Sequence, residues 1–215
     1  GFDKDVNIDS AIIDSLKELV GLNRQVSIEG DSIIKARPGV QLNFNAIAKG
    51  YGVDVVAQHL IDMGVENFLV EIGGEVRSHG LNTIDNRRWI LGIDKPVDGS
   101  APGTDFQAKV KLGDEAMATS GNYRNFYVKN GKKYAHTIDP MTGYPVDHNL
   151  LSASVIARNC SVADAWATGL MAMGLEKSKK VAKKNQLDVF LIYDEEGELK
   201  TFASQGFQDR MVLED

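Results

Sequence analysis

The apolar segment from residue 162 to residue 173 constrains the fold more than any other part of the chain. Only Asp164, Thr168 and one glycine interrupt its apolar side chains, and such a segment is typical of a helix buried in a core. On a helix, residues four apart lie on one face, one turn apart, so Asp164 and Thr168 face the same way. These two side chains need partners, because a buried carboxylate without one is very costly.

The residues alone leave two interpretations of this pair open. In the first, the two oxygen-bearing side chains bind a hard cation such as Mg²⁺, which is often held by one or two carboxylates together with substrate phosphates. In the second, Ser161 is the N-cap of the helix and Asp164 reaches back to it in a capping box, while Thr168 bonds the carbonyl four residues earlier. The helix by itself favours the capping box, and the two interpretations are compatible.

Length and composition limit the classes of function. With 215 residues, the chain is long enough for one large domain or two small ones. A net charge of −6 argues against nucleic-acid binding as the main function. Cys160 is the only cysteine, which excludes an internal disulfide and a cysteine-based metal cluster. No apolar run approaches the length of a membrane span.

The rest of the sequence predicts an α+β fold with many hairpins and few parallel crossovers. Helical periodicity extends over residues 10–20, 45–63 and 176–184, and Asn45 is the expected N-cap of the second helix. Apolar segments separated by turn residues predict hairpins over residues 25–35, 125–136 and 188–203. Further strands are expected at residues 67–72, 89–94, 106–112, 116–120 and 153–157.

Glycines stand at two unusual places. Gly50 and Gly52 fall in the early turns of the predicted helix, where each costs roughly 1 kcal/mol relative to alanine. Their presence indicates that another backbone or a ligand comes close. Lys49 beside them is suited to meet an anion, although a solvated surface lysine is the more common case. Gly73 and Gly74 interrupt a strand, which is expected to continue past a bulge.

Five blocks of this sequence together resemble the FAD:protein FMN transferases, also called ApbE-type flavin transferases. They are, in the family's order and spacing, NAIAKGYGVD at 45–54, EIGGEVR at 71–77, ATSGNYR at 118–124, HTIDPMTGYP at 136–145 and ADAWAT at 163–168. The resemblance implies an ApbE-like (T-fold-like) fold of mixed, mostly antiparallel sheets packed with helices. It also implies a single compact catalytic domain over residues 1–215 that lacks the family's N-terminal part.

The resemblance implies Mg²⁺-dependent transfer of FMN from FAD to a threonine or serine hydroxyl of an acceptor protein, which forms a phosphoester and releases AMP. The alternatives are an FAD pyrophosphatase that gives FMN and AMP, and a flavin-binding module without turnover. The expected partners are FAD and the acceptor protein, without nucleic acid. The expected location is the periplasm, where members are commonly anchored by a lipid, and membrane contact is expected only through a tether not present in this chain.

The resemblance also implies roles for individual residues. The metal ligands would be the side chains of Asp164 and Thr168 and the main-chain oxygens of Ala46 and Ala167. Contacts to FAD would come from Asn43, where family members usually have aspartate, and from Lys49, Gly73, Gly74, Thr119, Ser120, Gly121, His136, Thr137 and Ile138. The catalytic residues would be Asp164 and His136.

His136 is the expected general base, because the acceptor hydroxyl needs a proton acceptor that works near neutral pH. The alternative is that His136 only orders its loop through hydrogen bonds. For Arg77 and Arg124 the sequence leaves two roles open, a contact to phosphate and a structural ion pair.

Overall fold

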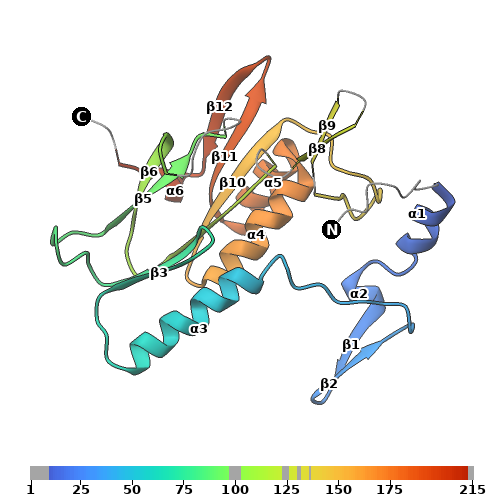
Figure 1. The fold of residues 1–215 in the computed structure, drawn as a ribbon, viewed down its shortest axis with the longest axis horizontal. Helices are drawn as coiled ribbons and strands as arrows, with labels where there is room; N and C mark the ends of the chain where they lie inside the picture. Colours follow the sequence, from blue (N-terminus) through green and yellow to red (C-terminus); the bar gives the residue numbers. More distant parts are fainter. Residues whose placement is uncertain (1–9, 97–102, 123–125, 130–131, 136, 213–215) are drawn as a thin grey trace.

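The computed structural model describes residues 10–96, 103–122, 126–129, 132–135 and 137–212, and Figure 1 shows their arrangement. Its centre is a six-stranded sheet with the order β12-β11-β10-β7-β4-β3, in which neighbouring strands pair antiparallel. The strands are β3 (Phe68–Ile72), β4 (Glu75–His79), β7 (Ala116–Gly121), β10 (Leu150–Ala157), β11 (Asp188–Glu195) and β12 (Glu198–Ala203). The predicted α+β class with mostly antiparallel strands is therefore confirmed.

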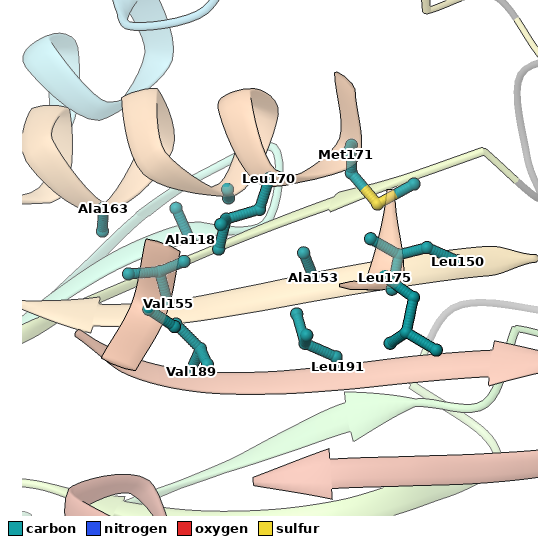
Figure 2. Packing of buried hydrophobic residues seen from close by; sticks show 12 residues of the cluster. Ala118, Leu150, Ala153, Val155, Ala163, Leu170, Met171, Leu175, Val189 and Leu191 are labelled. Atoms are coloured by element: carbon teal, nitrogen blue, oxygen red, sulfur yellow. The ribbon is translucent and has the colours of Figure 1, made fainter. Parts of the chain in front are cut away.

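Three helices cover one face of the sheet: α3 (Ala48–Asp62), α4 (Cys160–Met173) and α5 (Leu175–Asn185). Helix α4 packs on β7 and β10, and α3 packs on β3 and β4. Figure 2 shows Ala163 and Leu170 of α4 directed at Ala118, Ala153 and Val155 on the strands below. All five of these side chains are buried. The apolar segment therefore forms a core helix, as the sequence predicts.

The opposite face of the sheet is also buried. In β11, Val189 and Leu191 pack toward α4, whereas Phe190 and Ile192 belong to a second cluster on the other side. A hairpin of β5 (Trp89–Asp94) and β6 (Phe106–Leu112) covers that side together with the short helix α6 (Gln205–Gln208). Because both faces are covered, β11 has a continuous buried apolar run from Val189 to Ile192 rather than an alternating pattern.

The remaining elements lie beside the sheet. Helices α1 (Ser10–Lys17) and α2 (Leu22–Gln25) precede a hairpin of β1 (Val26–Glu29) and β2 (Ser32–Lys35), and β8 (Phe126–Lys129) pairs with β9 (Lys132–Ala135). In Figure 1 the blue segment from α1 to β2 reaches away from the central sheet. Within the described residues, no helix combines the length and apolarity needed to cross a bilayer.

The predicted hairpins and strands are confirmed, but three local predictions are wrong. The first helix ends at Lys17 rather than near residue 20, because Leu19 and Val20 bond carbonyls three residues back and form turns. Helix α3 begins at Ala48, and Asn45 is not its N-cap. Instead, the N–H of Asn45 donates to the side chain of Asn43, 2.8 Å away.

The third difference concerns Gly73 and Gly74, which form the two-residue turn of a β3–β4 hairpin rather than a bulge. Ile72 pairs with Glu75 directly across this turn. Both glycines have positive φ, +60° and +97°, as the tight hairpin turns that match strand twist require. The chain therefore reverses here, which brings Glu75 back beside Ile72.

Candidate active site

Helices α3 and α4 cross in direct backbone contact at Gly50. A Cβ atom on Gly50 would lie 2.5 Å from the carbonyl oxygen of Cys160 and 2.8 Å from the Cα of Ser161. Only a residue without a side chain fits there. The prediction that another backbone approaches is confirmed for Gly50, whereas a Cβ on Gly52 would meet only a side-chain atom of Ile72 at 3.4 Å.

This crossing holds the carboxylate of Asp164, which is 3% exposed. Its Oδ2 accepts a hydrogen bond from the N–H of Gly50, 3.0 Å away, while Oδ1 accepts none from the described residues. Burial raises the pKa of Asp164, and the Gly50 hydrogen bond and the charge of Lys49 partly oppose that rise. The site therefore contains a buried carboxylate with one oxygen that no described residue uses.

The capping-box interpretation of Asp164 is wrong. Helix α4 begins one residue before Ser161, its N-cap position is Asn159, and no side chain of that residue caps it. The cap comes instead from Asp54 on α3, which accepts the N–H groups of Cys160 and Ser161 at 2.9 Å each and the Ser161 hydroxyl at 2.8 Å. A residue distant in sequence thus takes the role that the local motif assigned to Asp164.

Asp54 also binds Arg77 of β4 at 3.0 Å, and both side chains are largely buried. Burial acts to raise the pKa of Asp54, but the hydrogen bonds from Ser161, Cys160 and Arg77 outweigh it and hold the pKa below its usual value. Of the two roles predicted for Arg77, the structure shows the ion pair, which Arg77 forms with Asp54. Arg124 lies outside the described residues.

Thr168 lies one turn after Asp164 and contacts β7 through its hydroxyl. Its Oγ1 is 3.1 Å from the hydroxyl oxygen of Ser120, and the expected bond to the carbonyl of Asp164 is absent among the described residues. A similar hydroxyl pair joins β7 and β10, where the Oγ1 of Thr119 lies 2.8 Å from the hydroxyl oxygen of Ser154.

Ala46 precedes α3 in a turn, and an unusual hydrogen bond of Gly50 keeps the helix from using its carbonyl oxygen. In a regular helix the N–H of Gly50 would bond the carbonyl of Ala46, four residues earlier. Here that N–H points to Asp164, whereas Ala48 and Tyr51 bond the carbonyls of Phe44 and Ile47 four residues earlier. The carbonyl of Ala46 accepts no hydrogen bond from the described residues. Ala167, the other predicted main-chain ligand, is fully buried within α4.

Lys49 on α3 pairs with Glu75, a residue that the sequence analysis did not single out. The ammonium nitrogen lies 2.7 Å from each oxygen of the Glu75 carboxylate, which is 2% exposed. Burial raises the pKa of Glu75; Lys49 lowers it and the charge of Asp164 adds to the rise. Strand alternation was the available signal, because Glu75 and Arg77 share a face of β4 and meet Lys49 and Asp54 of α3.

Cys160 lies among the same carboxylates. Its thiol is buried, and burial, together with Asp54, Glu75 and Asp164, raises its pKa to about 12. Because the thiolate is the nucleophile, Cys160 is excluded from a nucleophilic role near neutral pH.

A cavity of about 770 Å³ lies between the β3–β4 turn, the β5–β6 hairpin and β7. Four of the predicted FAD-contacting residues line it, namely Gly73, Gly74, Thr119 and Gly121. Ser120, between the last two, points instead toward Thr168. Apolar side chains such as Leu91 and Phe106 form the wall opposite, so the cavity can receive a flat apolar group with polar ends.

The remaining predicted residues lie on surrounding loops. Thr137 donates a hydrogen bond to Asn122, with 3.0 Å between the two oxygens, and Ile138 forms a bridge with Pro145. Asn43 is exposed and holds the turn before α3. His136, the predicted base, lies outside the described residues.

A second cavity, of about 670 Å³, lies between α5 and the segment from β12 to α6. Three lysines, Lys179, Lys180 and Lys183, contribute to its wall. None of the predicted site residues lines it. The candidate active site is therefore the crossing together with the cavity beside β7, which four of the predicted residues line.

Comparison with known proteins identifies the family of this chain. The model of the ApbE family matches residues 1–191. The solved structure of the flavin transferase ApbE from Vibrio cholerae has a TM-score of 0.84 and 38% identity, and the match covers 97% of this chain and 65% of that one. The fold is thus that of the ApbE flavin transferases. This chain belongs to the ApbE family.

Two curated relatives carry the name FAD:protein FMN transferase. The one from Vibrio cholerae is 43% identical over 183 residues, which are 85% of this chain and 54% of the relative. The one from Haemophilus influenzae is 39% identical over 203 residues, which are 94% of this chain and 55% of the relative. The chain spans about half the length of these relatives.

Proposed function

We propose that this chain is the catalytic part of an FAD:protein FMN transferase, which moves FMN from FAD to a threonine or serine hydroxyl of an acceptor protein and releases AMP. Membership of the ApbE family and the names of its relatives support this function. The observation that carries it is a buried carboxylate, Asp164, on a helix whose Thr168 contacts Ser120 of β7, while Thr119 and Gly121 of the same strand line a cavity together with Gly73 and Gly74.

The residues at the α3–α4 crossing fit a magnesium ion. Asp164 offers a carboxylate oxygen that no described residue uses, and Thr168 offers a hydroxyl one turn later. Ala46 offers a carbonyl that the helix does not use, and Ala167 is proposed as a further main-chain ligand. All are oxygen donors, which Mg²⁺ prefers. Among the described residues, no group of three His, Cys, Asp or Glu is placed to hold a metal, so the proposed ligand set draws on hydroxyl and main-chain oxygens.

When bound, magnesium would neutralise charge on the pyrophosphate of FAD. The chain itself supplies the remaining parts. Lys49 is proposed to donate to a pyrophosphate oxygen, and the backbone at Gly73 and Gly74 allows the ligand close approach. Asn43, Thr119, Ser120, Gly121, Thr137 and Ile138 are proposed to hold the nucleotide. Cleavage of a pyrophosphate depends mainly on such positioning and charge stabilisation.

His136 is proposed to accept the proton of the attacking acceptor hydroxyl. Its neighbour Thr137 is bonded to Asn122, the residue that follows β7, so the chain next to His136 is attached at the end of the strand that lines the cavity. A periplasmic location, an anchor outside this sequence and a domain extending over residues 1–215 stay predictions of the family resemblance.

The test incubates the protein with FAD and Mg²⁺, with and without an acceptor protein that carries the target threonine, and follows AMP release and the mass of the acceptor. We expect AMP together with FMN covalently bound to the acceptor. Release of AMP with only free FMN would contradict the transferase and support the FAD pyrophosphatase. Binding of FAD without AMP release would support a flavin-binding module without turnover.

A further inference from the structure

The ion pair of Lys49 and Glu75 differs from an ordinary surface pair. The carboxylate of Glu75 is 2% exposed, whereas the side chain of Lys49 is 50% exposed. The ammonium group lies 2.7 Å from both carboxylate oxygens. It donates a hydrogen bond to Oε1, and Oε2 accepts none from the described residues. Lys49 is therefore the side chain that compensates this buried charge.

If Lys49 swung away toward a ligand, Glu75 would lose that compensation. Removing one member of a buried pair is strongly unfavourable, because it leaves an uncompensated charge in the interior. Asp164 would make the loss worse, since its negative charge acts on Glu75. A free-swinging Lys49 is thus disfavoured even when an anionic ligand is present.

The geometry allows Lys49 to serve a ligand without leaving Glu75. An ammonium group has three donors, and a single carboxylate does not use all three. The side chain also runs along the β3–β4 turn, because a Cβ on Gly73 would lie 3.5 Å from the Cδ of Lys49. Gly73 lines the cavity beside β7, so the stem of the Lys49 side chain lies beside the turn that forms one end of that cavity.

We propose that Glu75 is a positioning residue that keeps Lys49 fixed at the rim of this cavity in both the free and the FAD-bound protein. Lys49 then acts as a directed hydrogen-bond donor, and Glu75 acts on FAD only through Lys49. This inference rests on the proposed function, since it takes FAD as the ligand.

A double-mutant cycle on FAD affinity tests the proposal. The variants are Lys49→Ala, Glu75→Gln and the double variant, each titrated with FAD in the presence of Mg²⁺. We expect each single variant to bind FAD about tenfold more weakly, and the double variant to bind no more weakly than Lys49→Ala, because contacting residues are non-additive. Unchanged or tighter binding by Glu75→Gln would overturn the proposal, as would multiplied effects in the double variant.

Melting of the FAD-free protein provides a second readout, which distinguishes a Glu75 that acts through Lys49 from one that supports the fold independently. Lys49→Ala leaves Glu75 buried without compensation, so its melting temperature should fall. Adding Glu75→Gln to Lys49→Ala should restore it, because the amide carries no charge. If Glu75→Gln instead lowers the melting temperature equally with and without Lys49, Glu75 supports the fold independently of Lys49 and the proposal fails.

The exposed pair of Lys200 and Glu198 on β12, 3.0 Å apart, is the matched control. Lys200→Ala and Glu198→Gln should change neither FAD affinity nor the melting temperature appreciably, as surface pairs contribute little. The two proposals fail differently: wild-type protein that does not bind FAD contradicts the proposed function, whereas failure of the positioning role appears only in the variants.

Discussion

Asp54 on α3 caps helix α4 by accepting both the N–H and the hydroxyl of Ser161, at 2.9 and 2.8 Å. Ser161 is three residues before Asp164, so this contact sets where the helix that carries the candidate metal ligand begins. Gly50, on the same helix as Asp54, binds Asp164 itself. One helix therefore fixes both the start of α4 and the orientation of its carboxylate.

Asp54→Asn should destabilise the protein by about 2–4 kcal/mol, because charged hydrogen bonds are lost and Arg77 is left partly buried without its partner. Chemical denaturation at neutral pH measures this loss. Asp62→Asn, at an exposed position near the end of the same helix, is the control and should stay within about 0.5 kcal/mol of wild type. Equal stability of the two variants would contradict the capping role.

The contribution of Asp54 should depend on pH. Its pKa is lower in the folded protein than the usual 3.8, so its stabilisation is present above that value and is lost as the pH falls through the lowered pKa. The stability difference between wild type and Asp54→Asn should thus be constant near neutral pH and shrink below about pH 4. Asp164 and Glu75, with raised pKa values, act in the opposite sense in both proteins. A difference that grows on acidification would contradict this.

Gly50→Ala and Gly52→Ala should have opposite effects although they lie two residues apart. The Cβ that Gly50→Ala adds would collide with the backbone of α4, so the helices must separate at a cost of about 1–3 kcal/mol or more. At Gly52 the nearest atom is the end of the Ile72 side chain, and alanine should stabilise the helix by up to about 1 kcal/mol. Thermal melting compares the two. Equal destabilisation would show that the helices do not cross as closely as described.

Asp164→Asn should separate stability from metal binding. Because the pKa of Asp164 is raised by burial, its charge costs stability at neutral pH in the metal-free protein. The variant should melt no lower than wild type without metal. Wild type should gain about 2.7 kcal/mol at a Mg²⁺ concentration 100 times its dissociation constant, and the variant should gain little. An equal Mg²⁺ shift in both proteins would remove Asp164 from the metal site.

Thr168→Val should weaken Mg²⁺ binding without unfolding the chain, since valine nearly keeps the shape of threonine. The lost contact is one hydroxyl pair with Ser120, worth about 1 kcal/mol. The Mg²⁺ dependence of melting gives the affinity, and the metal-free melting temperature is the internal control. A loss of metal-free stability as large as that of a core cavity variant, about 2–5 kcal/mol, would contradict this expectation.

Much of this fold follows from local signals in the sequence. The buried helix α4, the close approach at Gly50 and the hairpins were predicted because periodicity and turn residues act over a few positions. The cap of α4 was not, since Ser161 and Asp164 fit a local motif while the actual acceptor, Asp54, lies 107 residues before Ser161. A tertiary hydrogen bond of that kind leaves no pattern near the helix.

In the candidate site, too, some residues were predicted from the sequence and others depend on tertiary contacts. The resemblance named Lys49, Gly73, Gly74, Thr119 and Gly121, and the last four line one cavity. Glu75 was missed, because its role depends on the β3–β4 turn reversing the chain so that β4 faces α3. The sequence suggested a bulge there, which would have placed Glu75 elsewhere.

Metal-dependent chemistry at this site is tested most directly by AMP release from FAD by wild-type protein and by Asp164→Asn, each with Mg²⁺ and with a chelator. We expect AMP only from wild type with Mg²⁺. Equal AMP release by Asp164→Asn, or release by wild type that the chelator does not reduce, would contradict a metal-dependent reaction at the crossing of α3 and α4.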